Sequence, residues 1–340
     1  MLKNLEKFTI ICLSLILIFS ITSMAKQFQG ATPSTFQQAP VLEEKVKSGE
    51  LPPVEERLPV PEDVYVVDPN EEIGTYGGSL NTATLNPEGD GEDTMLAMGS
   101  NLVKPNADGS EIVPAVAKKV GSSADKTTWT LYLRKGLKWS DGEPLTADDV
   151  MFWYEDILLN EDLTPAISSN YKADGKVMQA RKVDEYSVEF KFLAPKPYFE
   201  NVMVHSSIWG FFKPKHYLKQ FHPKYTSKEK LDKLVQTSDY DYWYQLFNDK
   251  GAYNYSLPLS KELPTVGPYI LAQKTSSRRI FKRNPYFWKV DPEGNQLPYI
   301  DQLRTEITTD FEIIQGKIMS GDLDFVGLNT NVKNFPMYKK

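Results

Sequence analysis

Histidine, serine and aspartate are the residue types here that could support acid–base or nucleophilic chemistry, and their spacing decides whether they can. The sequence has three histidines, His205, His216 and His222. The last two are six residues apart, so on a helix they face different directions and cannot form the i, i+4 pair that binds zinc. His205 precedes Ser206 directly, but neighbouring strand residues point to opposite faces, and no Gly-x-Ser-x-Gly motif occurs. We therefore interpret the histidines as core or surface residues.

Two groups of carboxylates invite a catalytic or metal-binding interpretation. Asp148 and Asp149 fall in the first turn of a predicted helix, where negative charge is stabilised by about 0.3–1 kcal/mol, so a structural role accounts for them. The loop from Asn86 to Asp93 alternates oxygen-bearing side chains, yet its spacing departs from the EF-hand pattern and favours a solvated turn. No phosphate-binding loop and no dinucleotide fingerprint occurs. The sequence thus predicts no catalytic residue, no metal site and no cofactor.

The elements that position these residues are clearest between residues 128 and 158. Residues 128–134 alternate apolar and polar side chains, which predicts a half-buried strand. Ser-Asp-Gly at 140–142 favours a tight turn. Thr146 is then placed as a helix N-cap, and Asp149 completes a capping box three residues later. One face of this helix is apolar and is expected to pack on a core; it consists of Val150, Trp153, Tyr154, Ile157 and Leu158.

Two segments within this stretch resemble the signature of the peptide/nickel class of extracellular solute-binding proteins. Residues 135–142 read Lys-Gly-Leu-Lys-Trp-Ser-Asp-Gly, and residues 144–150 read Pro-Leu-Thr-Ala-Asp-Asp-Val. Gly-Pro-Tyr at 267–269 and Asn-Pro-Tyr at 284–286 extend the resemblance. Members of this class capture ligands for ATP-binding-cassette (ABC) importers. The resemblance therefore implies a binding protein rather than an enzyme, working by hinge closure around a ligand with importer membrane subunits as partners.

The same resemblance implies an α/β, two-lobed periplasmic-binding-protein-like fold of type II, the large class with an extra subdomain. Residues 76–301 are expected to form lobe I, with the inserted subdomain at about 87–197, and residues 302–340 to begin lobe II. Within that start, a helix over 311–320, a stop at Gly321 and a strand over 321–326 are predicted. The resemblance covers only about the N-terminal half of a family member. We therefore interpret the sequence as truncated, with lobe I nearly complete.

The N-terminal region carries two further predictions. Residues 1–25 combine two lysines, an apolar run of about 14 residues and small residues ending at Ala25, which is typical of a signal peptide. Export to the periplasm or extracellular envelope, and a soluble protein after cleavage near Ala25, are expected; a retained membrane anchor is the alternative. Residues 26–75 are rich in proline with little apolar periodicity, so we expect a tether or surface strap that gains little from burial.

The amino-acid composition limits the kinds of partner that the protein is expected to bind. The net charge of −6 gives no electrostatic reason to bind nucleic acid or anionic lipid. The only cysteine lies inside the apolar run, which excludes disulfides and thiol chemistry from the mature chain. Aromatic residues make up 12%, and aromatic walls suit both peptide side chains and sugar rings. A monomer that binds small peptides is the first expectation, and oligosaccharides are the second.

The ligand-binding residues are expected only from their positions in the chain relative to those of the family that the sequence resembles. They are Thr82, Ala83 and Thr84 at the end of the first strand, Ser168, Ser169, Asn170 and Tyr171 after the signature helix, and Ser206, Ser207 and Trp209 on the return path. Their hydroxyl and backbone groups could hold an extended ligand as an added strand is held. The alternatives are an exported hydrolase, for which no carboxylate spacing offers support, and a sensory module that presents ligand to a receptor.

Overall fold

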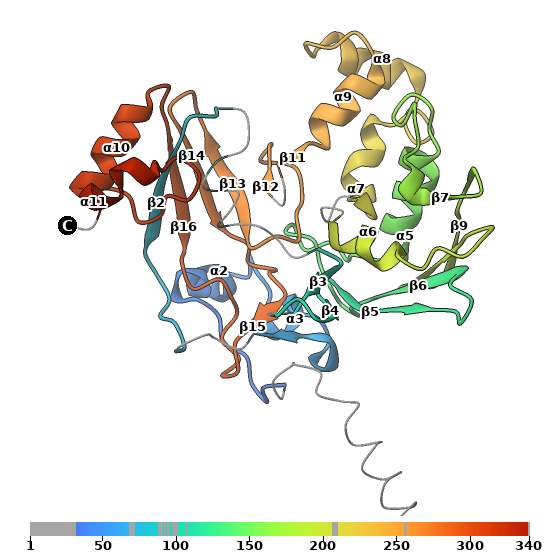
Figure 1. The fold of residues 1–340 in the computed structure, drawn as a ribbon, viewed down its shortest axis with the longest axis horizontal. Helices are drawn as coiled ribbons and strands as arrows, with labels where there is room; N and C mark the ends of the chain where they lie inside the picture. Colours follow the sequence, from blue (N-terminus) through green and yellow to red (C-terminus); the bar gives the residue numbers. More distant parts are fainter. Residues whose placement is uncertain are drawn as a thin grey trace, which may run out of the picture.

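A computed structural model describes residues 32–67, 72–87, 91, 93, 96, 101–106, 108–205, 210–254 and 257–338 of the 340-residue chain. Two bodies are visible, and each is built on a four-stranded sheet (Figure 1). The first sheet has the order β13-β14-β16-β2 and the second the order β5-β6-β10-β9. A mixed α/β arrangement of this kind agrees with the predicted fold class.

The first sheet brings together strands from both ends of the described chain. β2 and β16 are parallel, with Thr82 opposite Thr305, while β13, β14 and β16 pair antiparallel. Helix α10 (Phe311–Ser320) follows this sheet and ends at Gly321, whose φ of 78° makes it the predicted helix stop. The strands are β2 (Ser79–Thr84), β13 (Tyr269–Lys274), β14 (Arg278–Arg283) and β16 (Gln302–Ile307).

Two expectations about this region do not hold. β16 pairs with β2 and β14, so residues 302–307 belong to the first sheet rather than to a new lobe. Residues 321–326 form no strand, although the N–H of Asp324 donates to the carbonyl of Asn81 at 2.9 Å and its carboxylate accepts from the N–H of Asn81 at 2.7 Å. The chain after α10 therefore touches the edge of β2 without extending the sheet.

The second sheet carries the predicted strand, turn and helix. Its strands are β5 (Ala117–Ser122), β6 (Thr128–Leu133), β9 (Gln179–Asp184) and β10 (Ser187–Lys191). Helix α5 (Ala147–Phe152) continues as a π-helical segment, Trp153–Leu158. The body extends past residue 197, the expected end of the subdomain, because further helices pack on it (Figure 1). These are α6 (Phe199–His205), α7 (Lys215–Leu218), α8 (Lys228–Gln236) and α9 (Trp243–Lys250).

Smaller elements complete the described part of the chain. Its short strand pairs are β1 (Tyr65–Val66) with β15 (Lys289–Val290), β3 (Val103–Pro105) with β4 (Ile112–Pro114), β7 (Lys172–Ala173) with β8 (Lys176–Val177), and β11 (Tyr253–Asn254) with β12 (Leu257–Pro258). The short helices are Pro40–Leu42, α2 (Glu43–Lys47), α3 (Val54–Arg57), Pro61–Asp63, Ser169–Tyr171, Lys219–Phe221, Val332–Asn334 and α11 (Phe335–Tyr338).

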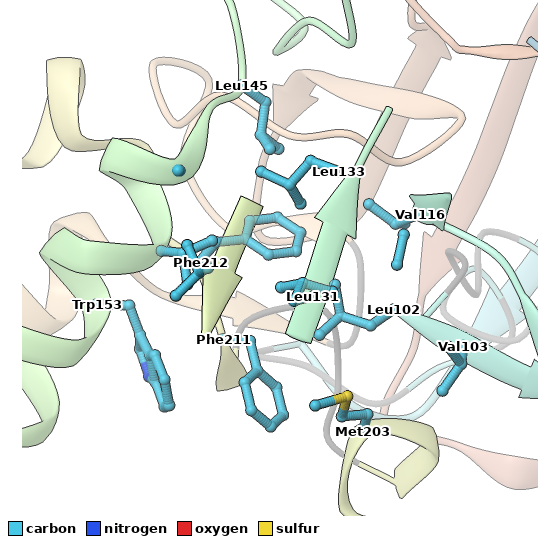
Figure 2. Close-up of a cluster of buried hydrophobic side chains, with 14 of the residues drawn as sticks. Leu102, Val103, Val116, Leu131, Leu133, Leu145, Trp153, Met203, Phe211 and Phe212 are labelled. Carbon is cyan, nitrogen blue, oxygen red and sulfur yellow. The ribbon is translucent and has the colours of Figure 1, made fainter. Parts of the chain in front are cut away.

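One large core holds the second body and reaches across to the first. Side chains from β6, α5, α6 and the segment before α7 converge in it (Figure 2). Tyr65, Val266 and Trp288 belong to the same cluster although they come from outside the second sheet. The two bodies therefore share buried apolar contacts. The residues drawn and labelled are Leu102, Val103, Val116, Leu131, Leu133, Leu145, Trp153, Met203, Phe211 and Phe212.

The strap, residues 32–67, is buried far more than expected. Leu42, Val54, Leu58 and Val64 are each 6% exposed or less, and Arg57 is fully buried. The Arg57 guanidinium donates to the carbonyls of Pro52 and Pro285 and to the side chains of Gln38 and Gln296. The expectation that residues 26–75 gain little from burial is therefore wrong for this part. Its apolar residues are irregularly spaced, so they give no periodic signal.

Candidate functional site

The signature segment is held in place by two glycines that nothing larger could replace without strain. Gly136 has a φ of 75°, and a Cβ there would lie 3.3 Å from the backbone nitrogen of Val60 in the strap. Gly142 has a φ of 93°, and a Cβ would lie 2.8 Å from the Tyr286 hydroxyl. Positive φ values and close approach are the conditions that favour glycine. The turn thus presses against both the strap and the Asn-Pro-Tyr segment.

Asp149 links three elements through one carboxylate. The capping box with Thr146 is confirmed: Asp149 Oδ2 accepts from the Thr146 N–H at 3.0 Å. Oδ1 accepts from the N–H of Lys215 in α7 at 3.0 Å, and Trp139 Nε1 lies 3.5 Å from Oδ2. The side chain is 4% exposed, and burial raises its pKa to about 6. Asp149 therefore joins the turn, α5 and α7.

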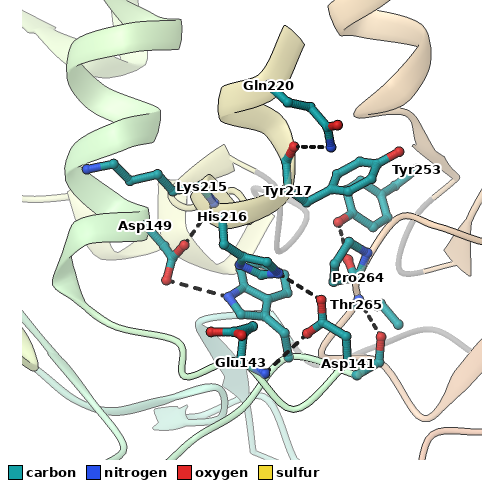
Figure 3. A network of polar contacts seen from close by, with 12 residues as sticks. Asp141, Glu143, Asp149, Lys215, His216, Tyr217, Gln220, Tyr253, Pro264 and Thr265 are labelled. Carbon is teal, nitrogen blue, oxygen red and sulfur yellow. Dashed lines mark hydrogen bonds and ion pairs between the residues drawn. The ribbon is translucent and has the colours of Figure 1, made fainter. Parts of the chain in front are cut away.

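A second set of contacts connects the turn to the segment before β13 (Figure 3). His216 Nε2 lies 2.8 Å from Asp141 Oδ2. The Ser140 N–H donates to the Thr265 carbonyl at 2.9 Å, and the Thr265 N–H donates to Ser140 Oγ at 3.0 Å. Tyr253 donates its hydroxyl to the Pro264 carbonyl. We call this set, together with the Asp149 contacts, the junction.

The junction orders structure rather than offering reactive groups. His216 contacts Asp141 and the Trp139 ring, whose centroid is 6.2 Å away. The adjacent Ser140 hydroxyl already accepts from Thr265, so no nucleophile is aligned with His216 among these contacts. Across the described residues, no group of three or more His, Cys, Asp or Glu side chains could hold a metal ion. The contacts suit a rigid joint between the two bodies.

A groove of about 730 Å³ opens between the strap and the signature turn. Pro52, Pro59 and Pro61 line it on the strap side, and Lys138 and Tyr286 on the other. Lys138 Nζ donates to the carbonyl of Glu56 at 2.6 Å. The groove is thus bridged at one point by a hydrogen bond from the signature segment.

The three predicted ligand residues of β2 are buried. The exposed fractions of Thr82, Ala83 and Thr84 are each 1%. Thr84 Oγ1 accepts from the Asn86 N–H at 3.0 Å. Thr82 Oγ1 has no hydrogen-bond partner within the described residues, and neither has Thr305 Oγ1 on the neighbouring strand. These side chains lie inside the first body.

The second predicted group lies elsewhere. Ser168, Ser169 and Asn170 are exposed, and Ser168 Oγ accepts from the Asn170 N–H at 3.2 Å. The Tyr171 ring packs on Trp153 with centroids 5.5 Å apart. β7, which follows directly, is in the other body from β2, and the two lie at opposite sides of Figure 1. The structure does not bring these two groups together; Ser206, Ser207 and Trp209 lie outside the described residues.

Sequence reasoning missed several residues of the junction. Asp149 was assigned only its local cap, His216 was interpreted as a core or surface residue, and Thr265 received no role. Ser-Asp-Gly was a sufficient signal for the turn, but nothing in the sequence pairs Asp141 with a histidine 75 residues away. The available signal was the resemblance itself, since the signature, Gly-Pro-Tyr and Asn-Pro-Tyr segments all meet here.

Comparison with known proteins identifies the class. The family described as bacterial extracellular solute-binding proteins, family 5 Middle, matches residues 111–339. A periplasmic alpha-galactoside-binding protein of Rhizobium meliloti (strain 1021) is 32% identical over 308 residues, which are 83% of this chain and 41% of the relative. The chain therefore belongs to the family 5 bacterial extracellular solute-binding proteins.

Two solved structures show the same architecture. An oligopeptide-binding protein OppA is 36% identical with a TM-score of 0.81, covering 91% of this chain and 50% of that one. The periplasmic binding protein MelB of Agrobacterium fabrum C58, in complex with stachyose, is 28% identical with a TM-score of 0.71, covering 91% and 46%. The chain thus spans half or less of the length of these relatives. No helix in its described part is long and apolar enough to cross a bilayer.

Proposed function

We propose that the chain acts as the ligand-capturing component of an ABC importer and that it captures small peptides. The observation that carries this proposal is the fit of 91% of the chain to an oligopeptide-binding protein, with 36% identity and a TM-score of 0.81. The junction supports it, because a lobe that closes over a ligand has to move as one unit. Ligand would stabilise a closed state, which importer membrane subunits would then recognise.

Residues 76–301 would form most of the first lobe in this mechanism, and the predicted ligand residues remain a proposal. Ser168, Ser169 and Asn170 offer exposed polar groups beside the partly buried Tyr171. The burial of Thr82, Ala83 and Thr84 restricts any contact from β2 to main-chain groups. Ser206, Ser207 and Trp209 complete the proposed set.

Oligosaccharides are the second candidate ligand, and two comparisons favour them. The Rhizobium meliloti relative is an alpha-galactoside-binding protein, and the MelB structure contains stachyose. The aromatic content of 12% suits sugar rings as well as peptide side chains. Peptide and sugar ligands are therefore to be tested side by side.

Scanning calorimetry of the chain from Lys26 onward tests both candidates. A ligand selective for the folded state raises the unfolding temperature, so a pool of di- to pentapeptides should raise it, whereas raffinose and stachyose should leave it unchanged. A shift with the sugars alone would establish the second candidate instead. A transition indifferent to both pools would contradict ligand capture by this chain.

Paired serine variants sharpen the test. Ser169→Ala removes an exposed hydroxyl from the proposed ligand surface, and we expect it to weaken peptide binding by about tenfold or less, as for one lost hydrogen bond. Ser122→Ala removes an exposed hydroxyl from the end of β5 in the same body and should leave binding unchanged. Equal effects of the two substitutions would argue against the proposed surface.

The proposal extends to export, oligomeric state and turnover. Residues 1–25 would be a signal peptide cleaved near Ala25, leaving a soluble monomer in the periplasm or extracellular envelope. The protein would hydrolyse neither peptides nor glycosides. Mass spectrometry of the secreted chain and light scattering test the first two points. A hydrolytic rate abolished by Ser206→Ala would contradict the third.

A further inference from the structure

Three cationic side chains surround the ring of Tyr65 in β1. Lys104 Nζ lies 5.4 Å from the ring centroid, Lys289 Nζ 5.4 Å and the guanidinium carbon of Arg134 5.1 Å. The three residues come from β3, from β15 and from the position after β6, and of these elements β3 and β15 lie near the middle of the molecule (Figure 1). We call this set the Tyr65 cation cluster. Its members are brought together only by the tertiary fold.

Aromatic rings account for part of this arrangement. The Trp288 ring centroid lies 5.0 Å from Lys289 Nζ and 5.2 Å from the Arg134 guanidinium carbon, and Phe287 lies 5.7 Å from Lys289 Nζ. A ring face attracts a cation by about 0.5–2 kcal/mol. This attraction holds each cation in place but does not remove the repulsion between them.

Among the residues described, the two lysines of the cluster lack the carboxylate neighbour that Arg134 has in Asp63. Neither Lys104 nor Lys289 forms an ion pair or hydrogen bond within the described part of the chain, and their contacts are with rings. Arg134 donates to the carbonyls of Ala115 at 2.9 Å, Asp63 at 2.7 Å and Ala117 at 3.5 Å. The buried Asp63 carboxylate accepts from the Lys135 N–H at 2.7 Å and pairs with Lys118. Its negative charge also raises the pKa of Arg134, against the effect of burial.

The charges of this cluster change the pKa of Lys289. Burial, with added repulsion from Lys104 and Arg134, lowers its pKa to about 7. Both lysines are partly exposed, whereas Arg134 and Trp288 are buried, so the cluster opens to solvent on the lysine side. The cluster thus combines a buried guanidinium with two partly exposed ammonium groups.

We propose that the Tyr65 cation cluster binds a small inorganic oxyanion, phosphate or sulfate, between Lys104 and Lys289. Sulfate, a dianion, and phosphate, mainly a monoanion at pH 6, each have enough acceptor oxygens for both ammonium groups and turn the repulsion between these groups into shared attraction. Arg134 adds positive charge while its Nε, Nη1 and Nη2 atoms each donate to a carbonyl. Since the whole chain has a net charge of −6, such binding is local rather than a general attraction for anions. The site is independent of the proposed transport ligand.

Calorimetric titration of the protein with inorganic phosphate and with sulfate at pH 6 tests the proposal, with sodium chloride holding the ionic strength constant. We expect saturable binding of at least one of the two anions. Lys289→Met and Lys104→Met should each weaken it by about tenfold or more, because each removes a charge-assisted hydrogen bond. Lys119→Met is the matched control, since Lys119 also lies over a tyrosine ring, with its Nζ 5.7 Å from the Tyr132 centroid, and it should leave binding unchanged.

Nuclear magnetic resonance of the Lys289 side chain gives a second measurement that does not depend on a variant folding. Bound phosphate favours the charged ammonium, so the anion that binds should raise the pKa of Lys289 from about 7. The proposal fails if neither anion binds saturably, if chloride at equal ionic strength gives the same signal, or if Lys119→Met weakens binding as much as Lys104→Met does.

Discussion

The signature segment, residues 128–158, and the strap, residues 32–67, pack into the same molecule but become ordered for different reasons. The signature segment follows local rules: a strand, a glycine turn and a capping box follow one another along the chain. The strap has helices of only three to five residues, and its order comes from distant partners. Asp63 binds Lys135, for example, and the N–H of Gln37 donates to the Gly294 carbonyl. Short helices of this length need tertiary contacts to persist.

The two regions also meet, which makes the comparison testable. The Val60 N–H donates to the Lys135 carbonyl at 3.0 Å, directly beside Gly136. Substitutions in the strap should therefore be costly only where they remove long-range partners. Substitutions in the signature segment should lower the free energy of unfolding where a residue with a locally determined backbone conformation also contacts a distant segment of the chain.

The largest effect is expected from Arg57→Met in the strap. The substitution keeps an extended apolar side chain but leaves the carbonyl of Pro52 and the side-chain oxygens of Gln38 and Gln296 without their donor. The Pro285 carbonyl keeps its hydrogen bond from Gln296 Nε2. Each buried acceptor left unsatisfied costs about 1–3 kcal/mol, so we expect the free energy of unfolding to fall by about 4 kcal/mol. Urea denaturation monitored by tryptophan fluorescence measures this loss.

Arg304→Met is the control, because Arg304 is exposed and its guanidinium bonds only Gln302 among the residues described. It should change the free energy of unfolding by less than about 0.5 kcal/mol. Similar small losses for both arginines would mean that the strap is a surface attachment after all, as the proline-rich composition suggested.

A smaller effect, dependent on pH, is expected at Asp149. Because burial raises its pKa from 3.8 to about 6, the folded state holds this proton more tightly than the unfolded state does. Its contribution to stability is therefore fully present below about pH 4 and is lost as pH rises to about 6. The gap between the two pKa values corresponds to about 2–3 kcal/mol.

Asp149→Asn should remove this dependence. The stability of the wild type relative to the variant, measured by urea denaturation, should therefore fall by about 2–3 kcal/mol between pH 4 and pH 7. Asp148→Asn changes an exposed carboxylate of the same turn, paired with Lys182, and should cost less than about 1 kcal/mol at pH 7. A pH-independent difference for Asp149→Asn would show that the junction does not bury this charge.

The sequence predicted those parts of the fold whose signals lie within about ten residues. The strand predicted at 128–134 and observed at Thr128–Leu133, the cap at Thr146 and the stop at Gly321 were predicted and are confirmed. The helix after Thr146 shows the limit of periodicity, because it widens into a π-helix at Trp153 while keeping its apolar face buried.

Features that depend on distant contacts could not be predicted. The strap was expected to gain little from burial because its apolar residues lack a period, yet Val54, Leu58 and Val64 pack against Val290 of β15, more than 200 positions away. The parallel pairing of β2 with β16 likewise has no local signal. In the candidate site, Asp149 was correctly read as a cap, whereas its bond to Lys215 required the packed helix α7.

The smallest difference between paired variants, and the sharpest comparison of local with distant constraints, is expected at the signature glycine Gly142. Gly142→Ala forces a Cβ onto a backbone with a φ of 93° and to within 2.8 Å of the Tyr286 hydroxyl. Gly175→Ala meets the first condition only, since its φ is 71° and no atom lies within 4 Å of its Cβ. The backbone conformation alone costs about 1–2 kcal/mol, so both variants should lose that much in urea denaturation. Gly142→Ala should lose up to about 1 kcal/mol more, and Tyr286→Phe should recover most of the excess, because it deletes the contacting hydroxyl. If the two alanine variants lose the same amount, the turn is constrained by its own backbone and not by the Asn-Pro-Tyr segment packed against it.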